Sequence, residues 1–166
     1  SAPTLAEAVR DVADVLTESF RDEMDAGGAR AVNEMRLVGR LGPLAWWIGC
    51  AYSLQMMPVG EGFTPGFVWV EAGRVVGNAT VRRASYMGPG FLIGNVAVLP
   101  DQRRRGIARR LMEACLEHAR TQDATWVALE VRTDNTPAVH LYQSLGFREI
   151  GAVAQLRREA HTPLPA

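Results

Sequence analysis

Lysine is missing from this sequence of 166 residues, in which all 18 basic residues are arginine. The 18 acidic residues balance them, so the formal net charge at pH 7 is zero. A chain without net charge has no overall field that would attract nucleic acid or an acidic membrane surface. We therefore expect neither nucleic acid nor a membrane among its partners.

Cysteine is scarce as well, since only Cys50 and Cys115 are present and they form no CxxC pair. This predicts buried, small apolar residues in a reducing compartment rather than a disulfide, and no metal site is expected. The sequence opens without a basic segment followed by an apolar one, so we expect a cytoplasmic location. Long apolar runs are also lacking, because the longest, residues 41–57, is shorter than the roughly 20 residues of a membrane span.

The composition is that of an ordinary globular domain, with 48% hydrophobic and 22% charged residues. Its length predicts one domain over residues 1–166, with a loose tail at 161–166. Thr4 and Glu7 have the spacing of a helix cap, and Thr136 is the predicted cap of a short helix whose first residue is Pro137. Periodicity and turn residues predict helices over 4–20, 31–38, 105–119 and 137–145, and strands over 67–70, 75–83, 91–98, 126–132 and within 147–156.

Ala72 and Gly73 predict a tight turn between the first two strands. One face of the helix over 105–119 is expected to be apolar, with Ile107, Leu111, Cys115 and Ala119 on it and Ala108 and Met112 beside them. This order of elements indicates one mixed α/β sheet.

The most informative stretch is residues 96–112, an apolar strand that breaks at Pro100 and resumes as a helix near Arg105. A helix that begins there presents N–H groups and the positive end of its dipole, which together bind anions. Gly106 and the small Ala108 leave room for a bulky anion such as a pyrophosphate. Five arginines gather here: Arg103, Arg104, Arg105, Arg109 and Arg110. The alternative is a solvated basic helix start without a ligand.

Two motifs carry a family resemblance. Arg103, Gly106 and Ala108 follow the pattern R-x-x-G-x-A, and residues 130–147 follow E-V-R-x-x-N-x-x-A-x-x-L-Y-x-x-x-G-F. In this order and separation they resemble the GNAT superfamily of acyl-coenzyme-A-dependent N-acetyltransferases. The resemblance covers about residues 67–150 and implies an α/β (α+β) fold. Its sheet would be mixed and mostly antiparallel, with a central β-α-β crossover, helices on both faces and the family's first strand absent or very short.

The resemblance implies acetyl-CoA as cosubstrate and no metal. Backbone N–H groups of the basic turn would bind the pyrophosphate, namely those of Arg104, Arg105, Gly106, Ile107, Ala108 and Arg109. Val96, Ala97 and Val98 would pair with the pantetheine arm as another strand would, where two parallel strands splay apart. An N–H near Val98 would face the thioester oxygen. Asn135 would hydrogen-bond the arm, or would instead serve in capping near Thr136.

Tyr142 matches the family tyrosine that protonates the coenzyme A sulfur, and packing beneath the sheet is its alternative role. A phenol has an ordinary pKa of about 10 and is protonated at neutral pH. Glu130 matches the acidic residue that acts as base in ribosomal-protein N-terminal acetyltransferases. Many other members carry an acid two or three positions before the Val-Ala-Val segment, where this sequence has Gly94 and Ile93. A structural ion pair for Glu130 and a weaker alternative base, His140, stay open.

The main interpretation is an N-acetyltransferase that moves acetyl from acetyl-CoA to a primary amine in a ternary complex. The acceptor would be a small molecule or a peptide N-terminus. A non-catalytic acyl-CoA-binding module is the alternative, and nucleic-acid binding by the arginine cluster is disfavoured by the zero net charge. Acceptor choice would lie in the first helices, the run 41–57 and the loop 58–66. The run is either a core helix or a wall of the acceptor site, and it makes a homodimer plausible.

Overall fold

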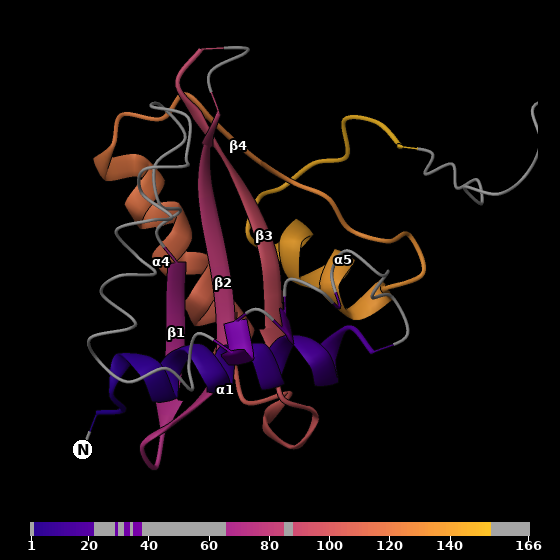
Figure 1. Cartoon of the computed structure of the whole chain (residues 1–166). Helices are drawn as coiled ribbons and strands as arrows, with labels where there is room; N and C mark the ends of the chain where they lie inside the picture. The colour runs from indigo at the N-terminus through magenta and orange to yellow at the C-terminus, as the bar shows by residue number, and fades with distance from the viewer. Residues whose placement is uncertain are drawn as a thin grey trace, which may run out of the picture. The chain divides into compact units, whose positions relative to one another are not determined.

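The computed structural model describes residues 2–21, 29, 32–33, 35–37, 66–84 and 88–153 (Figure 1). Two compact units make up the chain, residues 1–130 and residues 131–166. The apolar run 41–57, with Cys50, and the loop predicted over 58–66 lie outside the described residues, except that Gly66 already belongs to a strand. Among the residues described, no helix has the length and hydropathy needed to cross a membrane.

Helix α1 (Leu5–Ser19) begins where the sequence predicts, because Thr4 and Glu7 form a capping box. The Thr4 hydroxyl accepts a hydrogen bond from the Glu7 N–H at 3.3 Å, and the Glu7 carboxylate accepts one from the Thr4 N–H at 2.7 Å. These reciprocal bonds satisfy two N–H groups that the start of a helix leaves without helical partners. Residues 32–33 and 35–37 are helical as well, as predicted.

In the part of the chain that the structure describes, four strands form one sheet in the order β1 (Gly66–Glu71), β2 (Arg74–Ala84), β3 (Gly90–Val98) and β4 (Trp126–Leu129). The first two form a hairpin at Ala72 and Gly73, whose positive φ values of 49° and 80° fit a type I′ turn. β3 pairs antiparallel with β2 and parallel with β4, and helix α4 (Ile107–Thr121) connects β3 to β4. The predicted mixed, mostly antiparallel sheet with a central crossover is therefore confirmed.

Helices cover both faces of this sheet, as predicted, with α1 and α4 on opposite sides (Figure 1). On one face, Val15 of α1 packs with Val75 and Ala97 in a buried cluster. On the other face, Gly77 lies beneath α4, where an added Cβ would come within 3.0 Å of the Ile107 side chain. Glycine at this position lets the helix pack closely. The buried face of α4 matches the predicted one: Ile107, Leu111, Met112, Cys115 and Ala119.

Some boundaries differ from the predictions. Helix α4 begins at Ile107, two residues later than predicted, because Gly106 adopts a left-handed conformation just before it. Strand β4 ends at Leu129 rather than at residue 132, since its pairing with β3 stops at Ile93. Residues 147–153 form no strand, and their apolar side chains at Ile150 and Val153 are exposed rather than packed in a sheet.

Candidate functional site

The last residues of β3 extend beyond the end of its neighbour β4. The parallel ladder runs from Gly90 and Trp126 to Ile93 and Leu129, whereas β3 continues to Val98. The Leu99 N–H donates to the carbonyl of Val76 on β2 at 3.0 Å. Because peptide groups alternate in direction along a strand, those of Val98 and Val96 point away from β2. These peptide groups line the edge of β3 that has no β4 residue beside it, beyond the point where the parallel ladder stops.

A β-bulge lies in β3 between the part that pairs with β4 and the part that extends beyond the end of β4. The pairing shifts between Asn78 opposite Ala97 and Thr80 opposite Gly94, so β3 holds one extra residue there. Asn95, within this segment, has a positive φ of 51°, a conformation that asparagine tolerates better than most residues. Neither Gly94 nor Asn95 offers a titratable acid, as the sequence indicates.

The carbonyl of Val98 is already engaged within the protein. It accepts a hydrogen bond from the Arg103 Nε at 3.1 Å and another from the Ser19 hydroxyl at 3.3 Å. The first bond ties the strand to the turn before α4, and the second ties it to the end of α1. A ligand beside this edge would therefore meet the Val98 N–H rather than its carbonyl.

The start of α4 has the geometry of an anion site. Arg104 and Gly106 both have positive φ values, 60° and 80°, on either side of Arg105. Such alternation turns successive N–H groups toward one point, in the arrangement known as a nest. The Arg110 N–H donates to the Gly106 carbonyl at 3.1 Å and makes the first helical bond, so the N–H groups before it point out of the helix.

The space in front of Gly106 suits a bulky ligand. An added Cβ at this glycine would meet no protein atom within 4 Å. The protein therefore does not need glycine here to avoid a clash of its own, and glycine serves the backbone conformation and an approach from outside. These features fit the pyrophosphate of coenzyme A, whose charge the helix N-terminus would favour.

Several arginine side chains of the basic turn are held by other side chains. Arg105 forms an ion pair of 2.7 Å with Glu71 and also donates to Gln102. Its hydrogen bond, followed by that of the Trp69 indole, holds the pKa of the Glu71 carboxyl below its usual value. The Arg110 guanidinium lies over the Trp69 ring, 5.6 Å from its centroid. Strand β1 thus supports the turn, and these side-chain contacts do not use the backbone N–H groups of the nest.

Glu130 directly follows Leu129, the last paired residue of β4, and its side chain is exposed. It is the last residue of the first unit, which also holds Val96–Val98 and the residues of the basic turn. Arg132, in the second unit, forms a two-bond ion pair with Asp134, with distances of 2.9 and 2.6 Å.

Asn135 caps helix α5 (Thr136–Ser144) in the second unit. Its Oδ1 accepts a hydrogen bond from the Ala138 N–H at 3.3 Å. The prediction that Thr136 is the cap is wrong, because Thr136 is already the first helical residue and Pro137 the second. The capping role kept open for Asn135 is confirmed, and it uses only the oxygen of the amide. The Nδ2 group of the same side chain is a donor that capping does not require.

Tyr142 is the buried residue of α5, with 9% of its surface exposed. Its ring meets the ring of Phe147 edge to face, with 6.1 Å between the centroids. Burial raises the pKa of its phenol above the usual value, since the charged phenolate is poorly solvated there. His140, on the same helix, is exposed. The raised pKa keeps the Tyr142 phenol protonated at neutral pH.

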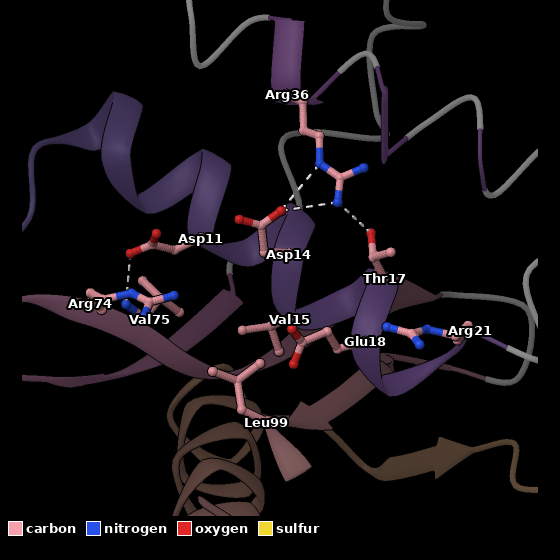
Figure 2. Close-up of a pocket in the computed structure, with 10 residues that line it drawn as sticks. All are labelled: Asp11, Asp14, Val15, Thr17, Glu18, Arg21, Arg36, Arg74, Val75 and Leu99. Atoms are coloured by element: carbon pink, nitrogen blue, oxygen red, sulfur yellow. Dashed lines mark hydrogen bonds and ion pairs between the residues drawn. The ribbon is translucent and has the colours of Figure 1, made fainter. Parts of the chain in front are cut away.

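A small pocket of about 270 Å³ lies beside α1 (Figure 2). Its charges largely offset one another, because three carboxylates and three arginines line it. Asp14 pairs with Arg36 at 2.9 Å, and Asp11 accepts a hydrogen bond from the Val75 N–H at 2.9 Å. None of the predicted site residues lines it, and its volume is below the usual range for small-molecule sites. The lining residues are Asp11, Asp14, Val15, Thr17, Glu18, Arg21, Arg36, Arg74, Val75 and Leu99.

The sequence does not point to three side chains that support this region: Ser19, Glu71 and Asn78. Ser19 and Glu71 reach their partners across 79 and 34 positions of sequence. No local pattern reports such contacts. Asn78 alone leaves a signal, because it is an amide within the mostly apolar segment 75–81 of its strand.

Residues 41–147 match the model of the Acetyltransferase (GNAT) family, and the chain belongs to this family. The [Ribosomal protein bS18]-alanine N-acetyltransferase of Salmonella typhimurium is 46% identical over 55 residues, which are 33% of this chain and 37% of that protein. The N-alpha-acetyltransferase RimI of Mycobacterium tuberculosis is 40% identical over 80 residues, 48% of this chain and 49% of that protein. The chain thus spans about a third to a half of the length of these curated relatives.

Solved structures share the fold. An aminoglycoside acetyltransferase from an uncultured soil metagenomic sample superposes with a TM-score of 0.65 and 21% identity, over 96% of this chain and 95% of its own. An aminoglycoside N-acetyltransferase in complex with CoA has a TM-score of 0.62 and 16% identity, over 92% of this chain and 89% of its own. At such identities the likeness concerns the fold alone.

Proposed function

We propose that this protein transfers acetyl from acetyl-CoA to a primary amine, which attacks the thioester directly in a ternary complex. The observation that carries the proposal is the extended edge of β3, tied by Arg103 to the nest before α4. Family membership supports it, and so does the CoA in the complex of a protein with the same fold. The relatives are named for a ribosomal-protein alanine and the structural neighbours for aminoglycosides, and both offer amines.

Binding of the donor would begin at the basic turn. The N–H groups from Arg104 to Arg109 would bind the pyrophosphate, and the dipole of α4 would add to their attraction. Val96 and Val98 would then pair with the amides of the pantetheine arm through the peptide groups that face away from β2. Asn135 would donate from Nδ2 while its Oδ1 caps α5. Each of these groups serves binding and orientation.

Acetyl-CoA supplies an acetyl group activated as a thioester. The Val98 N–H would stabilise the negative charge that develops on the thioester oxygen when the amine attacks. Glu130 would take the proton of the ammonium, directly or through water, so that the free amine forms the new C–N bond. Tyr142 would give its proton to the sulfur as the C–S bond breaks. The nitrogen would lose its second proton as the amide forms, and this proton would return to the Tyr142 phenol through water. The products are then an N-acetyl amine and CoA with a neutral thiol, and Glu130 would release the ammonium proton to solvent.

Calorimetry with CoA and acetyl-CoA, followed by a thiol-release assay with a panel of amines and N-terminal peptides, tests the proposal. We expect saturable CoA binding and thiol release that depends on both enzyme and amine. Binding without release for any amine would favour the acyl-CoA-binding module instead. Absence of CoA binding would end both assignments. The cytoplasmic location and the homodimer stay predictions, and light scattering in solution tests the second.

A further inference from the structure

Asn78 is the only buried polar or charged residue in the part of the chain that the structure describes, with 3% of its surface exposed. Its neighbours on β2 are mostly buried apolar residues. Burying an amide is unfavourable unless it forms hydrogen bonds. The Asn78 Nδ2 does so, because it donates to the backbone carbonyl of Asn95 at 3.1 Å. The buried amide therefore serves the bulge of β3.

Two side chains of β2 hold successive carbonyls of this bulge. Asn78 donates to the carbonyl of Asn95, which directly precedes Val96, and the Thr80 hydroxyl donates to the carbonyl of Gly94 at 3.0 Å. Asn78 lies opposite Ala97, which packs against Val15 of α1, so the Asn78 side chain is on the α1 face.

The bulge decides which way the peptide groups of Val96 and Val98 point. Without the extra residue, the end of β3 would shift by one position against β2, and every group would turn to the opposite side. The Val98 N–H would then face β2 instead of the edge beyond β4. The bond from Asn78 to Asn95 therefore stabilises the backbone on which the proposed pantetheine and thioester contacts depend.

We propose that Asn78 is a positioning residue for acyl transfer, which acts through the Asn95 carbonyl to aim the Val96–Val98 backbone at the pantetheine arm and thioester. The inference rests on the proposed function. Such a positioning role differs from a general role in folding, because it concerns the binding of only one part of acetyl-CoA, the pantetheine arm. The nucleotide end would bind at α4, which Asn78 does not support, whereas the arm would bind along β3.

Two ligands separate these roles: CoA, and 3′-phosphoadenosine 5′-diphosphate, which has the nucleotide and the diphosphate but no pantetheine. Asn78→Val removes the N–H donor of this side chain. We expect CoA to bind at least about fivefold more weakly, in line with the free-energy cost of leaving a buried carbonyl without its hydrogen bond. Binding of the nucleotide should stay within about twofold, because its site is separate. At saturating substrates, kcat should fall by about tenfold or more, since the Val98 N–H is misaligned.

Asn78→Thr is the rescue variant. Threonine has the shape of valine but keeps a hydroxyl donor, and Thr80 shows that such a hydroxyl reaches a bulge carbonyl. It should recover most of the CoA affinity and kcat. Val81→Ala is the stability control, because Val81 is buried on the same strand and lies opposite Ile93, outside the bulge. It should leave the ratio of the two affinities unchanged.

Wild-type protein that binds no CoA contradicts the proposed function itself. If the wild type binds CoA and Asn78→Val weakens both ligands equally, or neither, the inference about Asn78 is wrong while the proposed function stands. Should Asn78→Val not fold, Asn78→Leu replaces it, since leucine has nearly the shape of asparagine and, unlike a buried aspartate, brings neither a charge nor an O–H donor. Failure of both variants to fold would assign Asn78 to folding alone and overturn the inference.

Discussion

The guanidinium of Arg103 donates a hydrogen bond of 3.1 Å to the backbone carbonyl of Val98. Val98 ends β3, and Arg103 opens the turn that leads to α4. One side chain thus joins the strand proposed to bind the pantetheine arm to the turn proposed to bind the pyrophosphate. The distance between the two parts of the donor site depends on this bond.

Replacing Arg103 by methionine keeps a long apolar stem but removes the donor and the charge. We expect CoA to bind about tenfold more weakly, in line with the loss of one charge-assisted hydrogen bond. Arg120→Met is the matched control, because Arg120 pairs with Glu117 at the other end of α4. Calorimetry at one salt concentration compares them. Equal affinities for the two variants would contradict a role of Arg103 in the site.

Gly106 and Gly146 form a natural pair for a second test. Both have positive φ, 80° and 90°, and an added Cβ would meet no protein atom within 4 Å at either position. Alanine at each should therefore lower the free energy of unfolding by a similar amount, about 1–2 kcal/mol. Only Gly106→Ala should also weaken CoA binding, because its methyl group would stand before the N–H groups of the nest. A matching loss in Gly146→Ala would show that the effect comes from stability.

The parts of the fold that the sequence predicts are those with local causes. The capping box of Thr4 and Glu7 acts within four residues, and it places the start of α1 correctly. The hairpin turn at Ala72 and Gly73 and the apolar face of α4 also depend on neighbouring residues. The motif around Gly106 belongs to the same class, since the nest and the helix start form within one short segment.

What the sequence does not predict depends on contacts between distant segments. The end of β4 at Leu129 follows from the bulge in its neighbour, which no pattern within β4 reports. The Ser19 hydroxyl and the Val98 carbonyl meet across 79 positions of sequence. The choice of Asn135 over Thr136 as a cap is an exception, because it is a local matter between two suitable residues, and the ranking of cap residues places asparagine above threonine. The catalytic roles of Tyr142 and Glu130 stay predictions.

Tyr142→Phe removes the phenolic hydroxyl and keeps the ring that packs against Phe147. If Tyr142 protonates the sulfur, turnover should fall by about 10²–10⁴-fold at saturating acetyl-CoA and amine. CoA binding and thermal stability should change little, because the ring contacts remain. Acceptors of different amine pKa provide a further measure, since leaving-group protonation does not depend on them. Full activity of the phenylalanine variant would remove Tyr142 from the mechanism.

Glu130→Gln tests the base. A carboxylate that takes the ammonium proton makes activity fall as pH drops and the acid becomes protonated. In the glutamine variant we expect lower turnover and a flattened acid limb of the pH–rate profile. Glu149→Gln, at another exposed carboxylate, is the control and should keep the wild-type profile. An acid limb unchanged in Glu130→Gln would point to another base, such as His140.

Cys115 makes stability depend on alkaline pH. It is fully buried in α4, in agreement with the prediction from sequence, and burial raises the pKa of its thiol from 9.0 to about 11. Above about pH 9 the unfolded chain loses this proton while the folded chain keeps it, so stability falls as pH rises toward 11. Its contribution has a limiting slope of about 1.4 kcal/mol per pH unit.

Urea unfolding between about pH 8 and pH 10 measures this contribution of Cys115 before the Tyr142 phenol contributes. Cys115→Ala should be less stable at neutral pH, because it leaves a cavity, yet should lose less stability over this interval. Parallel curves for the two proteins would contradict the assignment.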